Sequence, residues 1–344
     1  MLLVAAALGA GIIAWRVVPI ILHPRSRAIG DGTDPQTYGF DLTHLRVPRD
    51  LVVGSGMPRD GLPTLDDPAV MTAGEVDRFN EQVRGKYLVG EDRVIGVVID
   101  RDVRAYPLRV LNWHEIVNDR LGDEPIAVSY SPLSDSAVVF SRRVDEQELS
   151  FGISGLLFNS HTLLYDRRES AAQQSLWSQL LARAVAGPAV HGGKSLEVLP
   201  AVVVRWDAWR ARHPETTVLA PDRVRLKRYS RSPYSSYRGS DLLRFPVRPL
   251  PPDESQPLKR PVLVVEAGGE QAVLSLHEIG RLADSNGVWR TVLGGVPLRF
   301  AYRKRPPTAF VDAEDGTPVS VIPTFWFAWY ASHPDSTLWR PDTR

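Results

Sequence analysis

The sequence predicts an α+β protein, rich in β-strands, in which one structural unit occurs twice and the second copy is shortened. Gly and Pro are plentiful, 26 and 28 of 344 residues, which favours many turns and short strands over a helical bundle. Short apolar runs separated by turn-like residues recur from residue 93 onward. Strands in succession with a few short helices are typical of α+β proteins. Several blocks of sequence also recur near the carboxyl end in the same order, which indicates a duplication.

Residues 1–22 are predicted to form one transmembrane helix that anchors the chain. The stretch is apolar except for Arg16, and roughly 20 apolar residues are needed to cross a bilayer. Trp15 and Arg16 are expected near a membrane interface, where the arginine can snorkel. A cleaved signal peptide, which has a shorter apolar core, and a buried or interfacial helix are the alternatives.

Residues 23–92 read as a linker and amino-terminal extension, rich in Gly, Pro, Asp and Arg. Within it, Thr72 and Glu75 have the spacing of a capping box, which predicts a short helix in AGEVDRFNEQV.

Copy one covers residues 93–222. Apolar runs at residues 94–99 and 103–108 predict a β-hairpin, and LNWHEIVNDRL at residues 111–121 is predicted to be a short helix. A helix is also expected at residues 206–212, ending before Pro214. Further short strands are expected at residues 126–130, 137–140, 149–153, 162–165 and 202–204.

Copy two covers residues 261–344, after a basic and Pro-rich connector at residues 223–260. One block of seven residues recurs at a constant separation of 120 residues. The pairs run from Trp206, Trp209, His213, Pro214, Thr217, Pro221 and Asp222 to Trp326, Trp329, His333, Pro334, Thr337, Pro341 and Asp342. Earlier blocks recur at larger separations, 163 for His114 with His277 and 172 for Tyr130 with Tyr302. Copy two therefore lacks a segment that corresponds to most of residues 145–195.

Charge and composition exclude several classes of protein. The chain has 41 basic and 40 acidic residues, a formal net charge of +1, which argues against a nucleic-acid partner. It has no cysteine, so disulfides, thiolate metal sites and cysteine nucleophiles are excluded. No metal-ligand set, phosphate loop or dinucleotide fingerprint rises above background, and we predict no cofactor. The connector interleaves arginines with tyrosines, which suits a solvated linker, a docking surface or a lipid-facing surface.

Long blocks of the sequence resemble a known family. AYPLRVLNWHEIVND, SYSPLSDSAVVF, FGISGLLFNSHTLLYD and AGPAVHGGKSLEVLP are similar to the bacterial and archaeal domain-of-unknown-function family 3179. The resemblance runs from about Arg59 to Asp342. It implies a shared architecture and an exported, often membrane-attached protein, and it implies no reaction.

One departure from this family concerns chemistry. Where the family typically has Cys-Pro-Leu-Cys-Gly-Thr, this chain has Ser131-Pro132-Leu133-Ser134-Asp135-Ser136. Two cysteines at that spacing suit a metal ion or a dithiol pair, and serine supplies neither. Any family chemistry that depends on those thiols is lost here.

The candidate catalytic residues are His114, Glu115, Ser131, Ser134 and Asp135. On a helix, His114 and Asn118 would share a face with Glu115 beside them, which suits proton transfer. The competing interpretation is a histidine that fixes the helix against the hairpin. The candidate ligand-binding residues, which suit the wall of a pocket, are Asn118, Tyr130, Ser154, Asn159 and Trp177.

We therefore expect a non-catalytic, membrane-anchored extracytoplasmic accessory subunit that stabilises a larger membrane protein complex. An electron-transport complex, respiratory or photosynthetic, is one possible host. The expected location is the cell inner membrane, with a single pass and a periplasmic body. Arg25 and Arg27 follow the anchor, and under the positive-inside rule they would keep the body in the cytoplasm instead. The alternative is an enzyme or small-ligand-binding protein with a pocket around His114 and residues 131–135.

Overall fold

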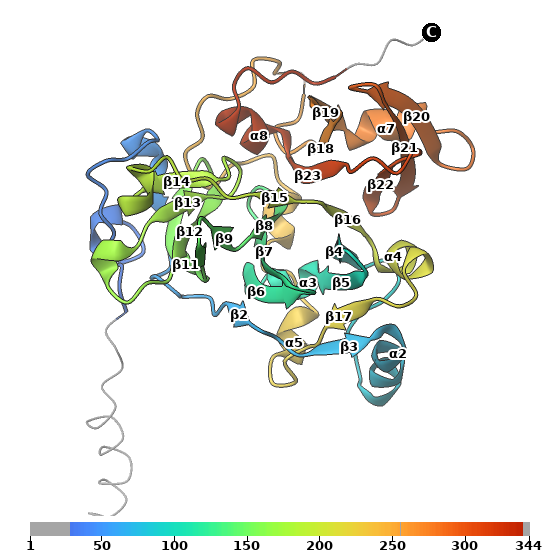
Figure 1. The fold of residues 1–344 in the computed structure, drawn as a ribbon, viewed down its shortest axis with the longest axis horizontal. Coiled ribbons are helices and arrows are strands. Elements are labelled where there is room, and N and C mark those ends of the chain that lie inside the picture. Colours follow the sequence, from blue (N-terminus) through green and yellow to red (C-terminus); the bar gives the residue numbers. More distant parts are fainter. Residues whose placement is uncertain (1–27, 255, 340–344) are drawn as a thin grey trace, which may run out of the picture.

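The computed structural model describes residues 28–254 and 256–339, and their fold is β-rich with small helices (Figure 1). Within this part of the chain there are seven α-helices of four to ten residues: α2 (Ala73–Gln82), α3 (Leu108–Leu111), α4 (Trp206–Arg212), α5 (Leu226–Tyr229), α6 (Ser235–Arg238), α7 (Leu276–Leu282) and α8 (Trp326–Ser332). The capping box of α2 is confirmed, because Thr72 Oγ1 accepts from the Glu75 amide at 3.2 Å and the Glu75 carboxylate accepts from the Thr72 amide at 2.7 Å.

Two five-stranded sheets form the centre of the first unit. The first has the order β16-β4-β5-β17-β3, with β16 (Ala201–Arg205), β4 (Arg93–Ile99), β5 (Asp102–Pro107), β17 (Thr217–Leu219) and β3 (Val70–Thr72). The second has the order β15-β8-β7-β6-β2, with β15 (Val198–Leu199), β8 (Ser136–Ser141), β7 (Glu124–Ser131), β6 (Ile116–Leu121) and β2 (Leu65–Asp66). Neighbours are antiparallel except β5 with β17 and β6 with β2. The predicted hairpin is confirmed as β4 and β5.

A third sheet interrupts the first unit between β8 and β16. Its order is β1-β11-β12-β13-β14, with β1 (Val52–Gly54), β11 (Phe151–Phe158), β12 (His161–Asp166), β13 (Leu176–Ser178) and β14 (Arg183–Ala186). We call β11 to β14 the inserted sheet. The short hairpin of β9 (Arg143–Val144) and β10 (Gln147–Glu148) precedes it. The amino-terminal extension packs on this sheet and contributes β1 (Figure 1).

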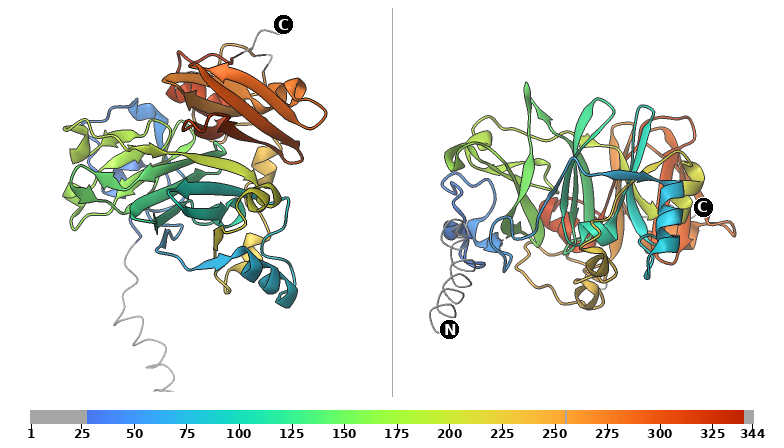
Figure 2. Two further views of the ribbon diagram at one scale, coloured as in Figure 1. Left: turned by 45° about the vertical axis from the view of Figure 1, so that its right-hand side comes forward. Right: turned by 90° about the horizontal axis from the view of Figure 1, so that it is seen from below.

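The second unit has two three-stranded antiparallel sheets. One has the order β19-β18-β23, with β19 (Glu270–Ser275), β18 (Pro261–Ala267) and β23 (Ser320–Phe325). The other has the order β20-β21-β22, with β20 (Val288–Leu293), β21 (Val296–Lys304) and β22 (Pro307–Ala313). This unit lies against one side of the first unit, and no strand of it corresponds to the inserted sheet (Figure 2).

The elements of the two units follow one another in the same order and with equivalent hydrogen bonds. Trp209 Nε1 donates to Thr216 Oγ1 at 2.9 Å, and Trp329 Nε1 donates to Ser336 Oγ at 3.0 Å. The parallel pairing of β5 with β17 also has an equivalent in the bridge between Val273 and Leu338.

The sheet of β6, β7 and β8 is buried on both faces. One face packs on the sheet of β4 and β5, through residues such as Ile95, Val128 and Val139. The other face packs on the inserted sheet and on α8 of the second unit, through Phe140 and Trp329 among others. Because this cluster contains side chains of both units, the units share part of their hydrophobic core.

Two predictions of secondary structure are wrong. Residues 111–121 are not one helix: α3 ends at Leu111, a turn follows, and β6 begins at Ile116. The apolar spacing of this segment fits a short helix, but the segment is buried between two sheets and strand pairing with β7 satisfies its backbone. His114 and Asn118 therefore do not share a helix face.

The predicted membrane-spanning helix is also corrected. Among residues 28–254 and 256–339, no helix is long and apolar enough to cross a membrane. The longest, α2, has ten residues and spans about 15 Å, half of a bilayer core. For the described residues, this finding corrects the fold class with a transmembrane helix and the predicted single-pass inner-membrane location. The predicted anchor at residues 1–22, with Trp15 and Arg16, lies outside the described residues.

Candidate functional site

Glu115 lines a cavity of about 260 Å³ in the first unit. The walls come from five separate segments: the amino-terminal extension, the turn before β6, the turn between β7 and β8, the inserted sheet and the connector. Most of the lining side chains are apolar, including Met57, Leu62, Leu133 and Phe245. An apolar cavity with a few convergent polar groups is the usual form of a small-molecule site.

The backbone holds Glu115 in a conformation that is unfavourable for it. Its φ is +53°, in the left-handed region that favours glycine. The Glu115 carbonyl accepts a hydrogen bond from the Tyr130 amide at 2.8 Å, which ties this turn to β7. A non-glycine residue in this region costs of order 1 kcal/mol and persists only where the surroundings enforce it.

The Glu115 carboxyl is buried and hydrogen-bonded by two hydroxyl groups. Only 8% of the residue is exposed. Thr162 Oγ1 donates to Oε2 at 2.8 Å, and Tyr234 OH lies 3.4 Å from Oε1. Burial raises the pKa of Glu115 to about 7, although both hydroxyl groups act in the opposite direction. The group therefore changes its charge near neutral pH, which is typical of functional carboxyls.

The two serines at the family's cysteine positions belong to different hydrogen-bond networks. Ser131 Oγ accepts from the Thr162 amide at 3.2 Å, so it lies next to the hydroxyl that bonds Glu115. Ser134 Oγ is 2.7 Å from Ser136 Oγ, which donates to Gln179 at 2.5 Å. Both serines are fully buried. Ser131 thus belongs to the Glu115 site, and Ser134 to the packing between β8 and the inserted sheet.

His114 is directed away from the Glu115 carboxyl. Its Nδ1 lies 2.7 Å from the Pro63 carbonyl and its Nε2 lies 2.9 Å from Tyr229 OH. Since the carbonyl can only accept, Nδ1 carries the proton and Nε2 accepts from the tyrosine. Burial lowers the pKa of His114, which keeps the ring neutral. The geometry supports the structural interpretation of this histidine.

Asp135 lies outside the Glu115 cavity, in a buried charged cluster. Arg93 binds its carboxylate with both nitrogens of the guanidinium fork, each at 2.8 Å, and Tyr130 OH donates to it at 2.5 Å. Although burial opposes ionisation, Arg93 and Arg238 hold the pKa of Asp135 below its ordinary value. Tyr130 and Asp135 thus belong to one cluster, and neither side chain lines the Glu115 cavity.

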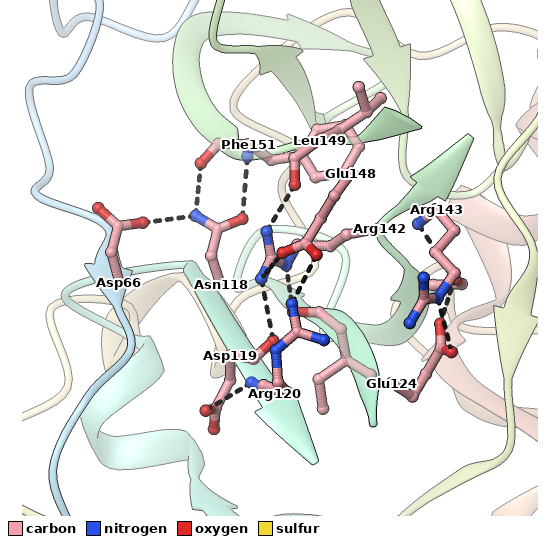
Figure 3. Close-up of polar contacts among 12 residues, drawn as sticks. Asp66, Asn118, Asp119, Arg120, Glu124, Arg142, Arg143, Glu148, Leu149 and Phe151 are labelled. Carbon is pink, nitrogen blue, oxygen red and sulfur yellow. Dashed lines mark hydrogen bonds and ion pairs between the residues drawn. The ribbon is translucent and has the colours of Figure 1, made fainter. Parts of the chain in front are cut away.

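Asn118 joins three strands (Figure 3). Its amide nitrogen donates to Asp66 Oδ1 at 2.7 Å and to the Phe151 carbonyl at 2.8 Å, and its oxygen accepts from the Phe151 amide at 2.9 Å. Beside it, the buried Arg142 donates to the carbonyls of Leu149 and Asp119, as Figure 3 shows. Every polar atom of the Asn118 side chain therefore has a protein partner, which indicates a structural role.

The remaining candidates for ligand binding lie apart from the cavity walls. Ser154 Oγ donates to the Leu163 carbonyl at 2.6 Å. Asn159 bonds the backbone of Arg248 in the connector and the Ala331 carbonyl in α8. Trp177 is in the core, edge-on to Phe151.

Two residues of the site, Thr162 and Tyr234, were not predicted from the sequence. Thr162 lies at the start of β12, and nothing in its neighbourhood distinguishes it from an ordinary strand residue. Tyr234 lies in the connector, where the mixture of tyrosines and arginines was the available signal. Among the described residues, no group of three or more His, Asp and Glu side chains is placed to hold a metal ion.

Fold and site together define a β-rich protein of two similar units, in which one unit encloses a carboxyl group in an apolar cavity. The family model described as "Protein of unknown function (DUF3179)" matches residues 59–316, about three quarters of the chain. The chain therefore belongs to this family, as the resemblance predicted. Neither the curated proteins nor the solved structures contain a match to it.

Proposed function

We propose that this protein binds a small, mostly apolar molecule in the Glu115 cavity, through a hydrogen bond between the Glu115 carboxyl and a carbonyl-type oxygen of the ligand. The observation that carries the proposal is Glu115 itself. It combines an unfavourable backbone conformation, a buried carboxyl and a pKa of about 7 at the wall of an apolar cavity.

The protonated form of Glu115 is the binding form in this proposal. A neutral carboxyl donates one hydrogen bond, and an apolar cavity strengthens it. Arg244, which is exposed and also lines the cavity, offers a second donor and disfavours a cationic ligand. A neutral molecule that accepts hydrogen bonds therefore suits the site better than an amine.

Ligand-observed NMR with benzamide and benzylamine tests this proposal. Benzamide should bind at pH 6 and several-fold more weakly at pH 8, because Glu115 loses its proton between them. Glu115→Gln keeps a donor and should bind benzamide with little pH dependence, whereas Glu115→Ala should lose binding. Glu91→Gln, at an exposed position, is the control. Benzamide binding that survives Glu115→Ala, or a preference for benzylamine, would contradict the proposal.

An accessory role in a larger protein complex is a second proposal, favoured by two exposed apolar side chains of the connector. Val224 is 94% exposed and Leu242 is 78% exposed. A stable assembly should appear as a high-mass species when the untreated extract is fractionated by size, and Val224→Ser with Leu242→Ser should dissociate it. A protein that fractionates at its own mass of 38.2 kDa would exclude this role.

A further inference from the structure

A second cavity, of about 370 Å³, lies where the two units meet. It shares no lining residue with the Glu115 cavity. Arg93 and Val203 line it from the first unit, Arg238 and Lys259 from the connector, and Leu263 and Phe325 from the second unit, among others. The proposed function above makes no use of this cavity.

Positive charge exceeds negative charge in its walls. Arg93, Arg238 and Lys259 are the cations, and Asp135 is the one carboxylate among the residues that line the cavity. Asp135 is bound by both fork nitrogens of Arg93, and the nearest nitrogen of Arg238 is 3.7 Å away. One carboxylate therefore balances one arginine, and a net charge of about +2 is left on the walls.

Lys259 is a buried ammonium group bound by neutral groups. Only 7% of the residue is exposed, and Nζ donates to the carbonyls of Tyr237, Ser240 and Leu242 at 2.6, 2.5 and 2.8 Å. It also lies 3.4 Å from the centre of the Tyr237 ring. Carbonyl dipoles and the ring fix the ammonium in place without cancelling its charge.

Arg238 has a donor without an acceptor. Its Nη2 donates to Asn112 Oδ1 at 3.1 Å and also bonds Tyr130 OH, whereas its Nε is buried and makes no hydrogen bond to any described residue. A buried donor left unpaired is unfavourable. An anionic oxygen in the cavity would satisfy this donor, and guanidinium groups suit carboxylate and phosphate oxygens.

The rest of the cavity wall is mostly apolar. The apolar lining residues include Val262, Leu263, Leu276 and Phe325, all from the second unit. Burial of an apolar group against these side chains would add to the binding energy.

We propose that this cavity binds a small organic anion, with its carboxylate or phosphate group hydrogen-bonded to Arg238 and its apolar part against the second unit. The three donors of Lys259 are already used by carbonyls, so Lys259 attracts the anion through its charge. The ligand would thereby contact the first unit, the connector and the second unit at once. Asp135 occupies the fork of Arg93 and opposes a second anion, so it limits the affinity of the site.

Isothermal titration calorimetry of the full chain at fixed ionic strength tests this proposal, with benzoate, phenyl phosphate and inorganic phosphate as probes and chloride as the background anion. Benzoate or phenyl phosphate should bind with a stoichiometry of one, and which of them binds more tightly identifies the anionic group. Inorganic phosphate should bind more weakly because it lacks the apolar part. Equal heats for all probes and for chloride would overturn the proposal.

Two variants should change the affinity in opposite directions. Arg238→Gln should raise the dissociation constant at least about tenfold, since it removes a charge and a donor. Asp135→Asn should lower it several-fold, since it removes the competing carboxylate and frees Arg93. Arg101→Gln, at an exposed position, is the control. If both variants weaken binding equally, the site is a structural cluster and the proposal fails.

Two measurements that do not use Asp135→Asn keep the proposal testable if that variant does not fold. Benzamide, the neutral analogue of benzoate, should not compete for this cavity, and Glu115→Ala should leave benzoate binding unchanged. Competition by benzamide would show that the anion is not recognised by charge. Loss of benzoate binding in Glu115→Ala would place the ligand in the other cavity.

Discussion

Glu115 precedes β6 in the first unit, and Gly287 precedes β20 at the equivalent place in the second. Both have positive φ, +53° and +77°. Both carbonyls accept a hydrogen bond from an equivalent tyrosine amide, that of Tyr130 at 2.8 Å and that of Tyr302 at 2.7 Å. The turn therefore imposes the same backbone on both units. Glycine adopts it freely, whereas glutamate adopts it at a cost.

The difference follows the presence of the inserted sheet. In the first unit, β11 and β12 cover Glu115 and complete its cavity, and Thr162 supplies a hydrogen bond. The second unit has no such sheet among its described residues, 261–339. The first unit, which has the cavity, carries a glutamate that reduces stability at this position, whereas the second unit carries a glycine at the equivalent position. This difference indicates that the Glu115 carboxyl serves binding rather than folding.

The largest expected effect concerns His161, which lies on the inserted sheet. Burial lowers the pKa of His161 from 6.5 to about 3. Below pH 6.5 the unfolded chain takes up a proton that the folded chain does not, so the free energy of unfolding falls as the pH decreases toward 3. Between pH 6.5 and pH 3, this effect should lower the free energy of unfolding of the unaltered chain by on the order of 5 kcal/mol. Urea denaturation of His161→Gln should not show this decrease.

His277→Gln, at an exposed position in the second unit, is the matched control and should leave the pH dependence unchanged. A parallel pH profile for His161→Gln and the unaltered chain would show that His161 is protonated in the folded protein.

Removal of the equivalent tryptophans tests whether the units are energetically independent. Trp209→Ala and Trp329→Ala should each cost about 3–5 kcal/mol, because each removes a buried indole and its hydrogen bond. Trp329 packs in the core that crosses to the first unit. Urea denaturation should therefore show one transition in both variants. Two separate transitions in either variant would contradict the shared core.

Charge burial at Glu115 gives a third prediction. Its pKa is raised from 4.5 to about 7, so the folded chain holds a proton that the unfolded chain releases. The free energy of unfolding therefore falls as the pH rises from 4.5 to 7 and then levels off. Glu115→Gln should be more stable than the unaltered chain by on the order of 3 kcal/mol at pH 8. Below pH 4.5 this difference in the free energy of unfolding should disappear.

Glu278→Gln is the control for this measurement. Glu278 is the residue that the sequence repeat pairs with Glu115, but it lies on α7 in an exposed ion pair with Arg281. Its replacement should change stability by less than about 0.5 kcal/mol at every pH. A gain in Glu115→Gln that does not depend on pH would show that charge burial is not its cause.

The smallest effect is expected from changing the residue types at the two positive-φ positions, 115 and 287. Gly287→Ala should destabilise by about 1 kcal/mol or more, because the new Cβ would lie 2.8 Å from the Tyr302 carbonyl and the residue would keep a positive φ. Glu115→Gly should stabilise by about 1 kcal/mol and abolish benzamide binding. Thermal melts well below pH 4.5, where Glu115 is protonated in both the folded and the unfolded chain, measure the effect of this substitution without the contribution of charge burial. If Glu115→Gly destabilises, Glu115 contributes more to folding than to binding.

Local chemistry made part of this fold predictable. The hairpin of β4 and β5 and the cap of α2 depend on neighbouring residues, and both were predicted close to their observed bounds. The helices of the repeated tryptophans were predictable for the same reason. The repeat, by contrast, paired His114 and Glu115 with His277 and Glu278, and the structure places those pairs in different elements.

The short strands, the turns and the order of elements depend on spacing and on residues close along the chain, so they can be predicted from the sequence. The tertiary structure was needed to establish that residues 116–121 form a strand, because burial between two sheets outweighs local helical spacing. It also decided which polar candidates belong together. Glu115, Thr162 and Tyr234 come from three segments that are distant in the sequence. Asp135 and Tyr130 instead belong to the buried charged cluster. A cavity made of such segments exists only when they have folded together.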